Sequence, residues 1–212
     1  MNKCTLITFL ASFGITLAAL AAPEPAIIQG PEEWTLSTEF QHLQQISVRL
    51  ANEERPRRYW YLILSVTNDS GRDVGFYPEC VLMTDTFELT AAGDNVPVAI
   101  FERIKQRYQE QYPFLEYVKT TTNKVLQGKD NTKDIAIIWP DFDSEANAVN
   151  LFISGLSNET VEIEHPALKD EKGHPVMVYL RKTLKIDYKI GGAPQLRQNA
   201  KVSYEEHNWV MR

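Results

Sequence analysis

An apolar run in the first third of the chain opens the stretch YWYLILSVTNDSG, residues 59–71. Both alternating sets of its side chains are apolar, with Trp60, Leu62, Leu64 and Val66 in one set and Tyr59, Tyr61 and Ile63 in the other. A strand of this kind is typically covered on both of its faces. The residues after Val66 tolerate turns and left-handed backbone. The pattern therefore predicts a central strand that ends in a tight connection.

A strict alternation of apolar and polar side chains marks the segment 176–190. Its even positions are apolar except for Lys182, and its odd positions are mostly polar. This period of two indicates a half-buried strand. Because the segment is longer than most strands, we expect a bend near Arg181–Lys182, where the chain crosses between sheets. Weaker patterns predict further strands at 40–50, 74–84, 87–90, 134–139 and 148–154.

One segment, residues 97–111, has a different period. Its apolar residues Phe101, Ile104 and Tyr108 recur at spacings of three and four, which is the period of an amphipathic helix. The proline that begins the segment suits a first helical turn, and Asn95 is a candidate N-cap. We therefore predict a single helix at about 97–111, inserted between strands.

Several short strands, one helix and no regular strand–helix alternation indicate an antiparallel β-sandwich. The stretches VLQGKDNTKDIAIIW (125–139) and VNLFISGL (149–156) resemble the paired strands of exported bacterial immunoglobulin-like domains, and VTNDSG (66–71) is similar to a strand-end turn in them. The resemblance covers roughly residues 40–190, and its relatives are exported proteins of unknown function. It implies a mainly β, immunoglobulin-like sandwich, from which the inserted helix departs.

The N-terminal segment has the features of an export signal. Lys3 is the only charged residue before Glu24, an apolar stretch follows it, and small alanines precede Pro23. This order is typical of a signal peptide, although an uncharged stretch of nearly spanning length leaves an uncleaved anchor as the alternative. We expect a signal peptide at 1–22, a linker at 23–34, the sandwich domain at 35–190 and a C-terminal segment that packs on the domain at 191–212.

Charge and cysteine content narrow the choice of partners. The formal net charge is −6 and the acidic residues are spread along the chain, which argues against nucleic acid because its binders cluster Lys and Arg. The densest basic patch, Arg55–Arg58, falls at a predicted loop. Without the signal, Cys80 is the only cysteine, so we expect no internal disulfide and a Cys80 buried in a strand.

An acidic turn follows the predicted strand 134–139 and contains the strongest candidates for oxygen ligands of a cation. Asp141, Asp143, Glu145 and Asn147 alternate as in calcium loops, but the Gly and Glu of an EF-hand loop are missing at its sixth and twelfth positions. We interpret the segment as a solvated turn whose side chains bond nearby amides, with calcium binding as the alternative. Glycoside hydrolysis needs two carboxylates at a defined separation. Asp141 with Asp143, or Glu159 with Glu162, could form such a pair, but nothing in the sequence fixes the distance between their carboxyl groups.

Two other constellations are candidates for binding sites. His174 with Met177, and likewise His207 with Met211, combine an imidazole with a thioether, which suits copper, but Cys80 lies far from both pairs in the sequence. Met177 falls on the polar side of its predicted strand, so we interpret it as a partly covered packing residue. Trp34 and Trp209 lie near the chain ends. They are candidates for exposed sugar-stacking rings, with packing onto the sandwich as the alternative.

Motifs for a nucleophile or a phosphate loop are absent from the sequence. We therefore predict no catalytic, cofactor or metal site. The expected function is that of a binding or structural module in the periplasm or cell envelope, or secreted, with no membrane span once the signal is removed. Recognition would use loops or an exposed sheet edge, and the partner would be another envelope protein or a glycan. The alternative is a carbohydrate- or metal-binding accessory domain.

Overall fold

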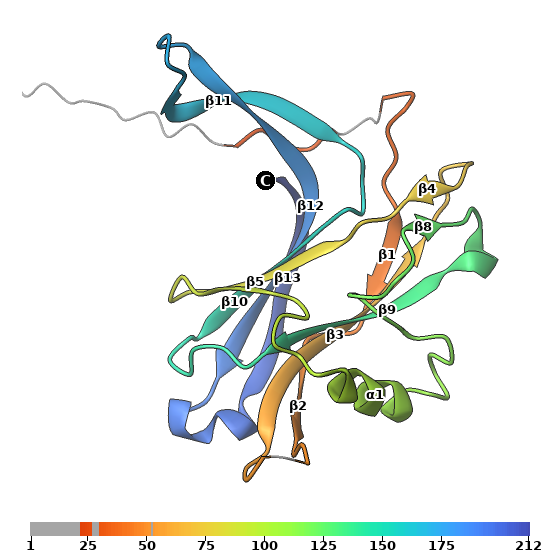
Figure 1. Ribbon diagram of the computed structural model, residues 1–212, viewed down its shortest axis with the longest axis vertical. Helices are drawn as coiled ribbons and strands as arrows, with labels where there is room; N and C mark the ends of the chain where they lie inside the picture. The colour runs from red at the N-terminus through yellow and green to blue at the C-terminus, as the bar shows by residue number, and fades with distance from the viewer. Residues whose placement is uncertain (1–21, 27–29, 52) are drawn as a thin grey trace, which may run out of the picture.

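The computed structural model describes residues 22–26, 30–51 and 53–212. This part of the chain is mainly β with antiparallel sheets, and it contains the helix α1 (Figure 1). The predicted signal peptide, residues 1–22, lies outside the described residues except for Ala22. Within the described ranges, no helix is both long enough and apolar enough to cross a membrane.

The first sheet is built around β3 (Arg57–Thr67), the central strand that the sequence predicts. β9 (Lys133–Pro140) pairs antiparallel with β3 along residues 59–66 and so occupies one of its edges. The other edge is shared by β1 (Ser37–Phe40) and β2 (Gln44–Val48), so the strand predicted at 40–50 is divided in two. β7 (Glu116–Tyr117) pairs parallel with β9.

The second sheet is built around β12 (Pro175–Gly191). β10 (Ala148–Ser154), β5 (Glu79–Thr84) and β6 (Leu89–Ala91) follow it in order on one side. β11 (Thr160–Lys169) and β13 (Lys201–Met211) also pair with β12. The smaller elements are β4 (Val74–Gly75), which pairs with β8 (Lys124–Val125), and the 3₁₀ helices at Lys129–Asn131 and Pro194–Asn199.

β12 does not cross between the sheets, contrary to the sequence-based expectation. It stays in the second sheet and changes neighbours at Arg181–Lys182, with β11 paired to residues up to Arg181 and β13 paired from Lys182 onward. The first half of β12 and β11 thus project from the sandwich as a two-stranded arm (Figure 1). The sequence pattern predicts neither β11 nor β13, and the segment 191–212, expected only to pack on the domain, supplies a full strand.

β9 and β10 lie in different sheets, so the pairing implied by the family resemblance is wrong. β9 pairs with β3, whereas β10 pairs with β5 and β12. The acidic turn between them carries the chain from one layer to the other. The prediction failed because an apolar pattern specifies that a strand is buried but not which strand lies next to it. Gly155, in the stretch VNLFISGL, is required by the backbone. It has φ +82°, and a Cβ at this position would clash with the carbonyl of Tyr77.

β3 is buried on both faces by two separate hydrophobic clusters. Between the sheets, Trp60 and Trp139 are register partners and are both fully buried. On the outer face of the first sheet, Tyr61 and Ile63 pack in a second cluster with residues of α1 (Val98–Arg107). The helix contributes its buried residues Ile100, Phe101 and Ile104. One apolar face of β3 therefore packs against the second sheet, and the other packs against α1.

The boundaries of α1 differ from the predicted ones. Pro97 is the N-cap residue, with an extended backbone, and no side chain of the described residues caps the helix. Asn95 therefore does not act as the predicted cap, and it has a left-handed φ of 55° instead. The helix ends at Arg107, because the next residue leaves the helical conformation, rather than continuing to 111.

A buried ion pair holds the base of the arm. Lys182 Nζ lies 2.8 Å from Glu159 Oε2, and their side chains are 8% and 3% exposed. The other carboxylate oxygen accepts a hydrogen bond from the Ala26 backbone N–H at 2.6 Å. Burial alone would raise the pKa of Glu159, but the hydrogen bonds from Lys182 and Ala26 hold this pKa below its ordinary value of 4.5. The pair thus ties the N-terminal segment to the arm.

Replacement of Leu151 by alanine should strongly destabilise the fold. Leu151 is fully buried between the sheets, so the truncation leaves a cavity that costs about 2–5 kcal/mol in the free energy of unfolding. The matched control is Leu168→Ala on the arm, where the side chain is 54% exposed and the change should stay below about 0.5 kcal/mol. Urea unfolding measures both variants, and equal losses would contradict the assignment of the core.

The Glu159–Lys182 pair predicts a specific acid sensitivity. Because the folded-state pKa of Glu159 is depressed, its stabilising effect is complete above the unfolded-state pKa and is lost as the pH falls through the folded-state value. Glu159→Gln should cost about 3–5 kcal/mol at pH 7, since it leaves Lys182 buried without a counter-charge. The variant should also lose less stability than the wild type between pH 7 and pH 3 in urea unfolding.

Glu164→Gln, on an exposed position of β11, is the control for this comparison. It should retain the acid sensitivity of the wild type. If Glu159→Gln and Glu164→Gln followed the same pH profile, the buried pair would not be the source of the acid sensitivity.

Candidate ligand-binding groove

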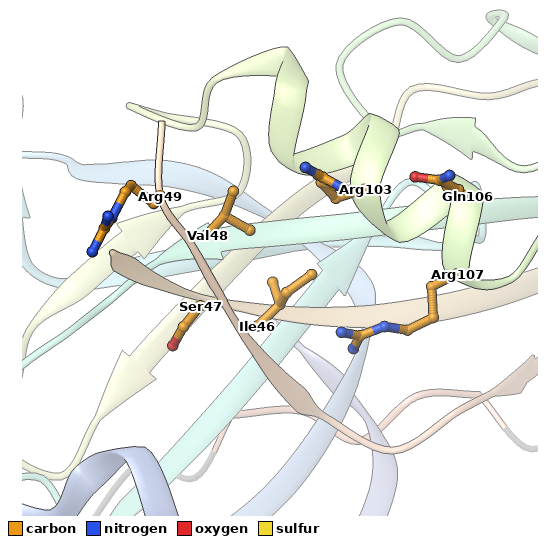
Figure 2. A pocket seen from close by; sticks show the side chains of 7 residues that line it. All are labelled: Ile46, Ser47, Val48, Arg49, Arg103, Gln106 and Arg107. Carbon is orange, nitrogen blue, oxygen red and sulfur yellow. The ribbon is translucent and has the colours of Figure 1, made fainter. Parts of the chain in front are cut away.

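A groove with a volume of about 490 Å³ runs between β2 and α1 (Figure 2). Four consecutive residues of β2 and its end, 46–49, line one side of it. Successive side chains of a strand point to opposite faces, so a groove that touches all four must follow the edge of the strand. The residues lining it are Ile46, Ser47, Val48, Arg49, Arg103, Gln106 and Arg107.

The period of α1 brings two arginines to this groove. The helix must bury Ile100 and Ile104 against the sheet, and Arg103 and Arg107 are four residues apart, so they share one flank of the helix. Figure 2 shows the Arg107 side chain extending from the helix toward Ile46 of β2, and Arg103 lines the same groove. Arg49, at the end of the strand, supplies a third guanidinium to the same groove.

Arg107 is held in place by a buried tyrosine of the central strand. Its Nη1 donates a hydrogen bond of 3.1 Å to the hydroxyl of Tyr61, which is fully buried. The Tyr61 hydroxyl in turn donates to Gln44 Oε1 at 3.0 Å. Burial and the hydrogen bond with Tyr108 raise the pKa of Tyr61 well above its ordinary value, so its hydroxyl stays neutral. The groove thus contains one preorganised guanidinium, oriented by the core.

None of the three groove arginines forms an ion pair with a carboxylate of the described residues. The groove lining also contains no Asp or Glu within the part of the chain that the structure describes. Guanidinium groups present planar sets of donors that match carboxylate and phosphate groups. The groove is therefore a cationic surface in a chain whose formal net charge is −6.

The strand beside these arginines has an unpaired edge. β2 pairs with β3 only, and no other strand among residues 22–26, 30–51 and 53–212 pairs with it. An edge strand presents a row of backbone N–H and C=O groups to solvent. The groove consequently combines backbone hydrogen-bonding groups with guanidinium groups that have no acidic partner.

The structure places the acidic turn in a different environment. Asp141 accepts hydrogen bonds from Trp60 Nε1 at 2.8 Å and from Arg58 Nε at 3.1 Å. Asp143 accepts the backbone N–H of Glu145 at 2.9 Å, and this bond is the largest contribution that lowers the pKa of Asp143. These carboxylates stabilise the turn that carries the chain between the sheets. In the described residues, no group of three or more His, Cys, Asp or Glu is arranged to hold a metal ion.

The histidine–methionine and cysteine candidates lie apart from the groove. His174 Nδ1 lies 3.3 Å from Asp170 Oδ2 at the tip of the arm, and Met177 is 45% exposed on β12. Cys80 is buried in β5 as predicted, and burial raises the pKa of its thiol to about 12. Cys80 is therefore protonated at neutral pH and fills space in the core.

The remaining candidates do not converge either. Trp34 and Trp209 are partly buried against the cluster between the sheets, which is the packing alternative for these rings. Glu159 is buried in its ion pair, whereas Glu162 is exposed on β11. These two carboxylates therefore occupy different environments.

The sequence pattern misses the groove arginines and favours Arg55–Arg58 as the basic patch. In the structure Arg57 pairs with Glu53, and Arg58 pairs with Asp141. The available signal was the spacing of Arg103 and Arg107 on one flank of the predicted helix. Nothing local to the sequence connects that flank with Arg49.

Comparisons of this chain with protein-family models, with curated proteins and with solved structures find no match.

Calcium should leave the melting temperature of the protein unchanged. Asp141 and Asp143 already accept hydrogen bonds from side chains and backbone of the fold, so a cation would have to displace these donors. Differential scanning fluorimetry with millimolar calcium, and with a chelator as the control, measures the effect. A rise of several degrees with calcium that the chelator reverses, and that Asp143→Asn abolishes, would show that the turn is a calcium site.

Proposed function

We propose that the chain is an exported binding module of the bacterial envelope that captures an anionic partner in the arginine groove. Export is supported by the basic, apolar and small-residue order of residues 1–22. We take the module to be an immunoglobulin-like antiparallel β-sandwich with α1 as an insertion. The two antiparallel sheets support the sandwich, and the place of α1 between β6 and β7 supports the insertion.

The observation that carries the proposal is a set of arginines without acidic partners in an acidic chain. Elsewhere on the surface the chain pairs Arg57, Arg58 and Arg72 with carboxylates. The groove arginines have no carboxylate partner among the described residues, and Arg107, which uses one donor on Tyr61, keeps its remaining donors for an external group. A preorganised donor loses less conformational entropy when a ligand binds, which favours affinity.

The composition of the groove favours binding over catalysis. Its lining residues offer guanidinium, amide, hydroxyl and aliphatic groups. General acid–base chemistry uses groups such as His, Asp or Glu with pKa values near the working pH. The groove residues instead supply fixed positive charge and hydrogen-bond donors, which suit the recognition of carboxylates.

Replacement of Arg103 and Arg107 by glutamine should weaken the binding of anionic probes by at least about 100-fold, since each replacement removes a charge-assisted hydrogen bond that contributes about 1.5–3 kcal/mol. The probes are a fluorescein-labelled Glu-rich hexapeptide and a labelled oligogalacturonate, and fluorescence anisotropy at two salt concentrations gives Kd. The affinity of the wild type should fall as salt rises.

Arg72→Gln is the matched control, because its guanidinium already pairs with Glu32 on the surface; it should bind both probes as the wild type does. The proposal fails if neither probe binds to the wild type, or if the double variant binds with unchanged Kd.

A further inference from the structure

The open edge of β2 has the form of a template for one more strand. β2 spans five residues, Gln44–Val48, and contains no proline. Natural edge strands are commonly blocked by proline, bulges or covering segments. Here α1 lies beside the edge and leaves a groove along it, instead of covering it (Figure 2). An extended chain laid in the groove would meet the backbone of β2 on one side and α1 on the other.

The two faces of such an added strand would have different neighbours. Side chains on the face shared with Ile46 and Val48 would lie toward α1, within reach of Arg103 and Arg107, because both β2 residues belong to or pack against the cluster under the helix. Side chains on the opposite face would lie near Ser47 and Arg49. The positive charges of Arg103 and Arg107 favour carboxylates at every second position of the added strand, on the face that points to α1.

We infer that the ligand is an extended acidic segment of a partner protein, which binds by adding to β2 as a further strand. The inference rests on the proposed function of the groove and specifies its ligand. Backbone hydrogen bonds to β2 supply affinity, and carboxylates at every second residue supply specificity through the helix arginines. Arg107, held by Tyr61, selects the position of one carboxylate. Arg103, one helical turn away on α1, pairs with another.

A polypeptide fits this groove better than an anionic polysaccharide. Only a polypeptide repeats alternating N–H and C=O groups at the spacing of a strand edge. A polysaccharide could satisfy the guanidinium groups but not the register of the backbone. The acidic residues spread over the rest of the chain also disfavour a long polyanion, which would extend beyond the short groove.

The experiment uses the purified full chain and a labelled (Glu-Val)₃ peptide. Two N-methylated forms of the peptide are compared, one methylated on the glutamates and the other on the valines. In an added strand only alternate N–H groups face β2. One form should therefore lose at least tenfold in affinity, and the other should stay within threefold of the parent. A (Lys-Val)₃ peptide should not bind.

Hydrogen exchange of the β2 amides gives an independent readout on the same complex. The (Glu-Val)₃ peptide should slow the exchange of alternate amides within Gln44–Val48, because these amides acquire partners. It should leave the amides of β6, the edge strand of the second sheet, unchanged. Uniform slowing across the whole chain would indicate general stabilisation and would overturn strand addition.

The outcomes separate the inference from the proposed function. Strand addition would be overturned, and the anion-binding groove retained, by either of two results. One is an equal loss of affinity for the two methylated forms. The other is oligogalacturonate binding that is at least as tight as that of (Glu-Val)₃ and depends on Arg103 and Arg107. Failure of every anionic probe would end both.

Sedimentation measures whether the chain self-associates. Self-association that requires Arg103 and Arg107 and disappears in Glu162→Gln/Glu164→Gln would identify β11 of a second copy as the occupant. That result would overturn the assignment to a partner protein. A chain that stays monomeric and binds only one of the methylated forms supports the inference.

Discussion

The structure depends on the need to cover β3 on both faces. Trp60, Leu62 and Leu64 point to one side of this strand, and Tyr61 and Ile63 point to the other; all five are buried. The second sheet covers the first set, and among the described residues no further sheet covers the second. α1 takes that place by burying Ile100, Phe101 and Ile104 against the outer face. Burial of each such side chain contributes about 1.5–3 kcal/mol, so the helix is part of the core. Its position fixes the groove, because a helix held over β3 next to the edge strand β2 leaves its arginine-bearing flank beside that edge.

The chemical groups that looked functional in the sequence are mostly used by the fold itself. Asp141 accepts hydrogen bonds from Arg58 and Trp60 where the chain passes from one sheet to the other. Glu159 neutralises Lys182 and binds the N-terminal segment at the base of the arm. Buried charges of this kind are costly to leave unpaired, so their partners are needed by the fold. The groove arginines have no acidic partner in the described chain, so their positive charge is available to an external anion.

The sequence predicts the elements whose signals are local. Two-sided apolar character identifies β3, alternation identifies most of β12, and the spacing of Phe101, Ile104 and Tyr108 identifies the region of α1. The pairing of strands is not local: β9 and β10 have the pattern of neighbours but lie in different sheets. β11 alternates Val161 and Ile163 with Glu162 and Glu164, but this pattern is short, Pro166 follows it and the strand is largely exposed, so its signal is weak. A bulge interrupts the alternation of β13. The site is harder still, because Arg49 and Arg103 meet only when the helix packs beside the edge of the sheet.

Native-state hydrogen exchange of the Ile104→Ala variant tests most directly whether α1 is a required cover of β3. Ile104 is fully buried between the helix and the sheet. We expect the amides of Tyr61 and Ile63 to lose the same free energy of protection as the whole chain loses in unfolding, about 2–5 kcal/mol. If the amides of α1 exchanged faster while those of β3 kept the protection of the wild type, the helix would be a separable appendage, and the groove beside it would not be fixed by the core.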